Sequence, residues 1–196
     1  MKKHSGFTLI ELMMVVAIIS VILVIGVPSM LRARQAANEA SAVACCKSLA
    51  TGEEIYVRSD RNGDGVLEYA TAMRGTNSLL ETNAGTGDLA IIDSRLAVAE
   101  GEPDAAISKN GYVFKILTAQ GPSGSGGARS FMANNGRGGM AMVQGFAIAS
   151  IPDAYDISGR MSFVLGPTGT VLQKDRGTTG VHETWYNPDD TWSPCE

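Results

Sequence analysis

One stretch near the N-terminus constrains this chain more than any other feature. Residues 7–27 are uncharged with a single exception, Glu11. A helix rises about 1.5 Å per residue, so these residues span the roughly 30 Å hydrocarbon core of a bilayer. Lys2 and Lys3 precede the stretch, and basic residues of this kind hold their end in the cytoplasm. We therefore predict a single membrane-spanning helix whose following residues are exported.

The alternative interpretation of this stretch is a secretory signal peptide. The apolar region of such a peptide is usually about 7–15 residues long and is followed by a small-x-small cleavage site. The stretch in this chain is longer, contains an acid and lacks that site at its far end. These three differences favour the membrane anchor.

Glu11 is the informative residue of the stretch, because a carboxylate inside a bilayer is costly and marks a candidate functional site. No basic residue lies within the stretch to pair with it. Cleavage after Gly6 would give Phe7 a free α-amine about one helical turn from Glu11. In an assembly, the amine of one subunit could instead meet Glu11 of its neighbour.

The motif Gly-Phe-Thr-Leu-Ile-Glu after a short basic leader resembles the type IV prepilin signature, which pilins share with the pseudopilins of type II secretion. The resemblance covers Met1 to about Pro28. It implies cleavage between Gly6 and Phe7 by a prepilin peptidase, N-methylation of Phe7 and a role for Glu11 in assembly. It also implies as partners the bacterial inner membrane, its assembly machinery and further copies of the chain.

The predicted helix does not stop at the membrane. Residues 29–58 contain no proline and are rich in alanine and other helix formers. Pro28 lies between the two halves, and a proline inside a helix usually bends or breaks it. We predict one long helix from Phe7 to about Val57, bent or locally melted at residues 26–28. Type IV pilins often carry a proline near this point, which adds Pro28 to the assembly residues implied by the resemblance.

The exported half of this helix has two different faces at 100° per residue. One face is a stripe of alanines, Ala33, Ala36, Ala37, Ala40 and Ala44. The opposite face carries mostly larger side chains, Ala42, Cys45, Cys46, Leu49 and Tyr56. We expect the larger residues to pack on the chain's own sheet. The alanines favour close contact with another helix over simple exposure to water.

The second half of the chain is glycine-rich and changes to strand-like patterns. Four antiparallel strands are predicted within residues 112–119, 144–151, 161–165 and 170–174, and the last two flank a Gly-Pro-Thr-Gly hairpin signature. Glycine-rich residues 121–127 and 134–139 are predicted loops. Two short helices are expected within residues 68–80 and 89–100.

These elements predict an α+β chain with one helix laid on a small antiparallel sheet of about four strands. This is also the pilin-like fold that the N-terminal resemblance implies. The predicted divisions are a leader (1–6), a transmembrane or filament-core helix (7–27) and the exported half of the long helix (28–58). A region of loops and short helices (59–110) and the sheet with its C-terminal tail (111–196) follow.

The segment after the helix contains a weak calcium candidate. Asp60, Asn62, Asp64 and Glu68, with an intervening glycine, resemble the first part of an EF-hand loop. The twelfth position is Thr71, where such a loop places a bidentate glutamate. An Asx-rich turn that ends the helix is the favoured interpretation. No other metal or cofactor is predicted.

The three cysteines fall in the exported region, where disulfides persist. Vicinal cysteines rarely bond each other, so we predict a bridge from Cys46, or from Cys45, to Cys195. It would close a loop of about 150 residues, nominally worth some 4–5 kcal/mol in the chain-entropy model. Three free thiols are the alternative, and the sequence does not distinguish Cys45 from Cys46.

Charge and motifs argue against two broad functional classes. The formal net charge is −4 and no basic patch occurs, so nucleic acid is not a predicted partner. The chain contains no G-x-S-x-G, H-E-x-x-H or C-x-x-C motif, and His182 is the one histidine outside the predicted leader. We therefore predict that the protein is not an enzyme.

The favoured function is a structural subunit of a type IV pilus-like filament, which starts in the inner membrane and ends in an extracellular or periplasmic filament. The first alternative is a pseudopilin of a type II secretion system. A membrane-tethered extracellular binding module is the second. A simple tether requires neither Glu11, nor a peptidase motif, nor a long helix with two distinct faces, whereas a filament subunit uses all three.

Overall fold

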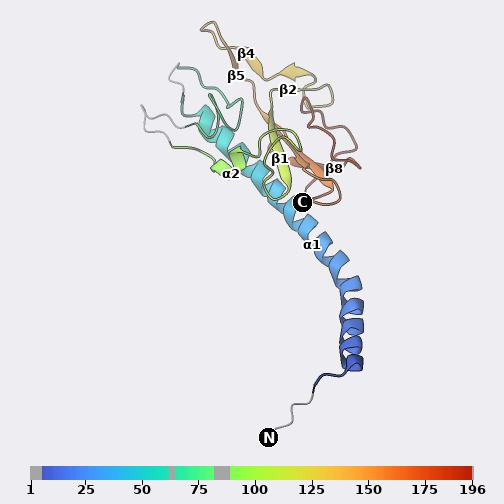
Figure 1. Ribbon diagram of the computed structural model, residues 1–196. Helices are drawn as coiled ribbons and strands as arrows, with labels where there is room; N and C mark the ends of the chain where they lie inside the picture. The colour runs from blue at the N-terminus through green and yellow to red at the C-terminus, as the bar shows by residue number, and fades with distance from the viewer. Residues whose placement is uncertain (1–5, 62–64, 82–88, 196) are drawn as a thin grey trace.

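The first element is a single long helix, α1 (Leu9–Val57), which confirms the predicted continuous helix. The computed structural model describes residues 6–61, 65–81 and 89–195. The helix begins at Leu9, two residues later than the predicted start at Phe7, because Thr8 is extended and caps it. Figure 1 shows that the N-terminal half stands clear of the rest of the molecule, whereas the C-terminal half is covered by it.

The helix stays helical through Pro28 and bends, as Figure 1 shows, before it reaches the domain. Proline cannot donate the amide hydrogen that would bond the carbonyl of Val24, and its ring crowds that carbonyl. The hydroxyl of Ser29 donates to the carbonyl oxygen of Gly26 at 2.9 Å, which ties the two sides of the proline together. The predicted bend is therefore present without local melting.

The two predicted faces of the exported half are confirmed except at one residue. Ala42, Cys46, Leu49 and Tyr56 are buried, Cys45 is only half-buried, and the whole alanine stripe is exposed. The buried face contacts three strands of the main sheet, β6, β7 and β8. The core lies between that face and the sheet, where Leu49, Phe114 and Phe163 are almost completely buried.

The main sheet is antiparallel and has five strands in the order β1-β6-β7-β8-β9. Its members are β1 (Tyr112–Leu117), β6 (Ala147–Pro152), β7 (Met161–Leu165), β8 (Val171–Asp175) and β9 (Ser193–Pro194). The four predicted strands match β1, β6, β7 and β8. The fifth, β9, comes from the C-terminal tail and covers the outer edge of β8. The α+β, pilin-like architecture is therefore present, with one strand more than predicted.

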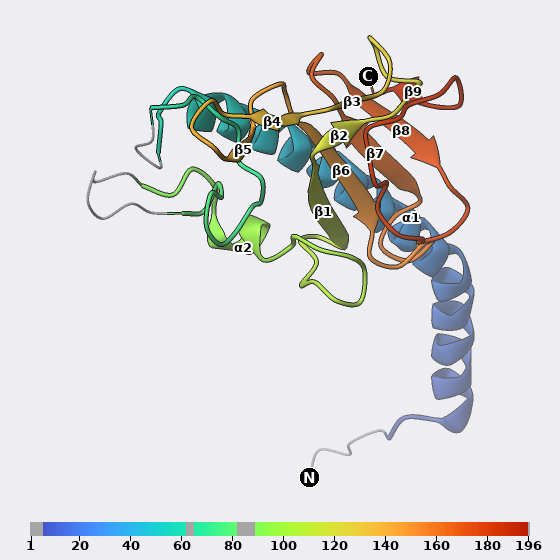
Figure 2. The same ribbon diagram turned by 90° about the horizontal axis from the view of Figure 1, so that it is seen from above.

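Two small ribbons extend the molecule away from the bare helix. One pairs β2 (Ala119–Gln120) with β3 (Arg129–Ser130), and the other pairs β4 (Met132–Asn134) with β5 (Met140–Met142). Figure 1 shows the β4–β5 ribbon at the end of the domain opposite the N-terminus, and Figure 2 gives a second view of both ribbons. The two glycine-rich segments form their connecting loops, as predicted.

The prediction of two short helices before the sheet was largely wrong. Residues 68–80 contain no helix, and residues 89–100 contain only the four-residue α2 (Ser94–Ala97). Gly75 and Asn77 adopt positive φ angles of 99° and 53°, which interrupt a helix. Distant carboxylates also bond the backbone here, because Glu100 accepts from the amides of Met73 and Arg74 at 2.9 and 3.2 Å.

Candidate assembly site

The start of α1 holds the predicted processing residues together. Gly6 and Phe7 precede the helix and are exposed. Thr8 and Glu11 form a reciprocal cap, in which the Glu11 carboxylate accepts from the Thr8 amide at 2.9 Å and from its hydroxyl at 2.7 Å. The Glu11 amide donates to the Thr8 hydroxyl oxygen at 3.4 Å. The Glu11 carboxylate is therefore held against Thr8 at the N-terminal end of α1.

The N-terminal half of α1 has a continuous apolar surface without a partner inside the described parts of the chain. The large apolar side chains from Phe7 to Leu31 are exposed; Leu9, Val24 and Ile25, for example, are 74–76% accessible. By length and composition this segment is able to cross a membrane. An apolar surface of this size requires lipid or other protein around it.

A cleft lies where α1 enters the globular domain. It encloses about 670 Å³ between one side of the helix, at Pro28, Leu31 and Arg32, and the loop after β6, at Asp156 and Arg160. The membrane-facing stretch and the folded domain therefore meet without an intervening spacer.

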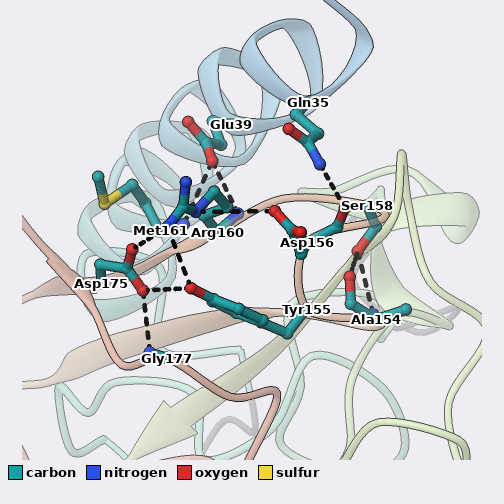
Figure 3. A network of polar contacts seen from close by, with 10 residues as sticks. All are labelled: Gln35, Glu39, Ala154, Tyr155, Asp156, Ser158, Arg160, Met161, Asp175 and Gly177. Atoms are coloured by element: carbon teal, nitrogen blue, oxygen red, sulfur yellow. Dashed lines mark hydrogen bonds and ion pairs between the residues drawn. The ribbon is translucent and has the colours of Figure 1, made fainter. Parts of the chain in front are cut away.

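Polar contacts attach this loop to the helix, as Figure 3 shows. The Glu39 carboxylate accepts from the amides of Arg160 and Met161 at 2.8 and 3.2 Å. The Gln35 side-chain amide donates to the carbonyl of Asp156 at 2.5 Å, and the Asn38 side-chain amide donates to that of Ser158 at 2.8 Å. These contacts fix the position of the loop along the axis of α1.

Asp175 at the end of β8 completes the network. Its carboxylate accepts from the Gly177 amide at 2.9 Å and from the Tyr155 hydroxyl at 3.0 Å, and it pairs with the Arg160 guanidinium at 3.2 Å. These partners hold the pKa of Asp175 below its ordinary value, the Gly177 amide most of all. Asp175 thus stays ionised and keeps Arg160 over the cleft.

The cysteines are arranged asymmetrically around α1. Cys46 is buried, Cys45 and Cys195 are half-buried, and all three contact the hydrophobic core. Cys46 lies near enough to Cys195 for the two thiols to interact electrostatically. Cys45 faces the opposite flank, near Ser41 and Lys109. Burial raises the pKa of all three thiols, that of Cys46 most strongly. All three thiols are free in this structure, and the disulfide stays a prediction in which the geometry favours Cys46 over Cys45.

The calcium candidate lies only partly in the described chain, because Asn62 and Asp64 fall outside it. The Asp60 carboxylate accepts from the Gly65 amide at 3.0 Å, and the Glu68 side chain is buried. Among the residues that the structure describes, no cluster of three or more metal-ligating side chains occurs. Calcium binding therefore stays untested.

Sequence reasoning missed two buried titratable groups. Glu53 of α1 is fully buried, and its carboxylate accepts from the Ala70 amide at 2.9 Å. Burial raises the pKa of Glu53 to about 8. His182 is 4% exposed, and burial lowers its pKa. The helical period could have identified Glu53, because it lies on the same face as Leu49 and Tyr56.

Comparisons with known families divide the chain into two parts that overlap at the membrane segment. A family model described as "Protein of unknown function (DUF2950)" matches residues 23–195. The model of the prokaryotic N-terminal methylation motif matches residues 1–27, which include Gly6, Phe7 and Glu11. No curated protein and no solved structure gives a significant match. The motif supports a type IV pilin-like or pseudopilin-like protein, in agreement with the apolar helix and the fold.

Proposed function

Since the chain belongs to the family described as protein of unknown function (DUF2950) and also carries the N-terminal methylation motif of type IV prepilins, we propose that it is a structural subunit of a type IV pilus-like filament. The observation that carries this proposal is the union of that motif with an exposed apolar half-helix on one continuous α1. The unassembled chain would be anchored in the inner membrane and would join the filament through this helix.

Processing would prepare the helix for assembly. A prepilin peptidase would cut between Gly6 and Phe7, remove Lys2 and Lys3, and leave an α-amine beside the Thr8–Glu11 cap; that amine would then be methylated. The new amine would offset the charge of Glu11, which is otherwise costly inside a membrane. Because Glu11 is already held at the N-terminal end of α1, it is well placed to pair with an amine of its own or of a neighbouring subunit.

The rest of α1 supports the same role. The bend at Pro28 would let the apolar half adjust its direction while the exported half stays fixed on the sheet. The exposed alanine stripe would let neighbouring helices approach closely in the filament centre. A bridge between Cys46 and Cys195 would fasten β9 to the helix. We propose a structural rather than a catalytic role for all of these residues.

The proposal is tested by blocking cleavage. Gly6→Val is expected to leave a longer chain in the membrane and to abolish filaments, because a β-branched side chain would occupy the position next to the cut bond. The matched control is Gly26→Val, another exposed glycine with open space around it, which is expected to be cleaved normally. Normal filaments from an uncut Gly6→Val chain would contradict the proposal.

A pseudopilin of a type II secretion system is the second candidate, because the methylation motif serves both filament types. Filaments that project from intact cells favour the pilus, whereas short periplasmic filaments and a secretion defect in a deletion strain favour the pseudopilus. A chain that is cleaved yet stays monomeric in the membrane would instead favour a tethered binding module.

A further inference from the structure

We infer that the end of the globular domain nearest the membrane stretch rests on the bilayer before assembly. Ile157 is then inserted among lipid headgroups, and Arg32 and Arg34 pair with anionic lipids. This inference rests on the proposed membrane insertion of α1. It concerns a different surface, which consists of the loop at residues 153–160 and the adjoining turn of α1. The partner is a phospholipid surface.

The position of the loop along the axis of α1, relative to the end of the membrane stretch, is the first argument. Leu31 is the last residue of the exposed apolar side of the helix, and Arg32 is the first charge after Glu11. The predicted membrane stretch ends at Val27, four residues or about 6 Å along the axis below Leu31. The polar layer on each side of a bilayer is also roughly 6 Å deep. Leu31, with Asp156 and Arg160 of the loop across the same cleft, therefore lies at the level of the headgroups.

The contacts of the loop place one apolar side chain at this level. Ile157 lies between Asp156, whose carbonyl accepts from Gln35, and Ser158, whose carbonyl accepts from Asn38. Both bonds hold the loop against α1, and Figure 3 shows the one from Gln35. The Ile157 side chain is 77% exposed on the surface of the loop. At this level it would leave water on contact with lipid, which is favourable for an apolar side chain.

The charges around Ile157 suit an anionic lipid surface. Arg32 and Arg34 are exposed and about 200° apart around α1, so they reach headgroups on opposite sides of the helix. Neither has an ion-pair partner among the residues described. The acids that line the cleft have partners within the protein. Asp156 and Asp175 pair with Arg160 at 3.8 and 3.2 Å, and Glu39 accepts from two backbone amides. Long basic side chains near the end of a membrane helix reach lipid phosphates at the interface, whereas their apolar stems stay near the acyl chains.

A second copy of the chain is the competing occupant, and the position of the loop argues against it. The cleft that Asp156 lines is also lined by Pro28 and Leu31, which directly follow the membrane stretch. The proposed surface therefore adjoins the segment that crosses the bilayer. Lipid is already present there in the unassembled state, before any neighbour arrives.

Photo-cross-linking of the full chain tests the inference. The photo-cross-linker p-benzoylphenylalanine replaces Ile157, Met140 or Val16, one position at a time, in chains reconstituted into phosphatidylethanolamine–phosphatidylglycerol vesicles. Met140 is the matched control, since it is 64% exposed but lies on the β4–β5 ribbon at the far end of the domain. Val16 lies in the membrane stretch and reports insertion. We expect lipid adducts at positions 16 and 157 and their absence at position 140.

Each other result overturns a defined part of the account. A lipid adduct at position 16 without one at 157, or a cross-link from 157 to a second copy, overturns the inference and leaves the proposed function intact. Absence of the adduct at position 16 overturns membrane insertion, and with it both proposals. Arg32→Gln combined with Arg34→Gln is expected to reduce the adduct at position 157, and an unchanged yield would contradict the role of the two arginines.

Discussion

Replacement of Glu53 by glutamine should remove most of the alkaline loss of stability of this protein. The carboxyl group is fully buried on α1, and its pKa is raised from 4.5 to about 8. The folded state therefore prefers the protonated form. Its stability is undiminished below pH 4.5 and is lost progressively as the pH rises from 4.5 through 8. At about 1.4 kcal/mol per pH unit, the nominal loss at pH 8 and above approaches 5 kcal/mol.

Glu53→Gln keeps an oxygen that accepts from the Ala70 amide but cannot ionise. The new amide nitrogen would take the place of the second carboxylate oxygen, which is buried without a partner, and this costs about 1–3 kcal/mol. The variant should therefore be equal to or less stable than the wild type at pH 4. At pH 9 it should be more stable by about 2–4 kcal/mol, or roughly 5–15 °C in Tm.

Thermal unfolding of the full chain in detergent, followed by circular dichroism between pH 4 and 9, measures this difference. The matched control is Glu54→Gln, one residue further along α1, where the carboxylate is half exposed and pairs with Arg58. That variant should follow the wild-type pH dependence. Parallel wild-type and Glu53→Gln curves across the whole range would refute the reasoning.

Three further predictions concern assembly, acid stability and the cysteines. Glu11→Ala should insert into membranes at least as well as the wild type but assemble poorly, because the Phe7 amine loses its partner; equal filament yields per membrane-inserted chain would rule out the pairing. His182→Gln should lessen the loss of stability below pH 6.5, since burial keeps the folded-state imidazole neutral; an unchanged acid profile would contradict this. A non-reduced digest should link Cys195 to the peptide that contains Cys45 and Cys46, and Cys46→Ser should abolish that link whereas Cys45→Ser should not; complete alkylation of Cys195 without reduction would contradict the bridge.

The elements that the sequence predicts well are those with a long or regular pattern. The composition of α1 and its two faces predicted both the length of the helix and its buried side, and the Gly-Pro-Thr-Gly turn marked the hairpin between β7 and β8. Binary patterns of this kind are local, so they can be interpreted without knowledge of the partners.

The elements that were missed depend on partners distant in the chain. Residues 68–80 contain helix-forming residues, but the amides of Ala70 and Met73 bond the carboxylates of Glu53 and Glu100 instead of the carbonyls of a helical turn. Strand β9 has two residues, one of them a proline, and exists because the edge of β8 accepts it. The cap between Thr8 and Glu11 is local, and its Thr-x-x-Glu spacing was present in the sequence as a capping-box signal.

The most direct test of the central claim is the mass of the N-terminal peptide of the chain isolated from sheared filaments. The account predicts a peptide that begins at Phe7, carries one additional methyl group on its α-amine and is absent from a strain without prepilin peptidase. Filaments built from chains that still begin at Met1 would contradict it. So would a sheared cell fraction that contains the cleaved chain but shows no filaments.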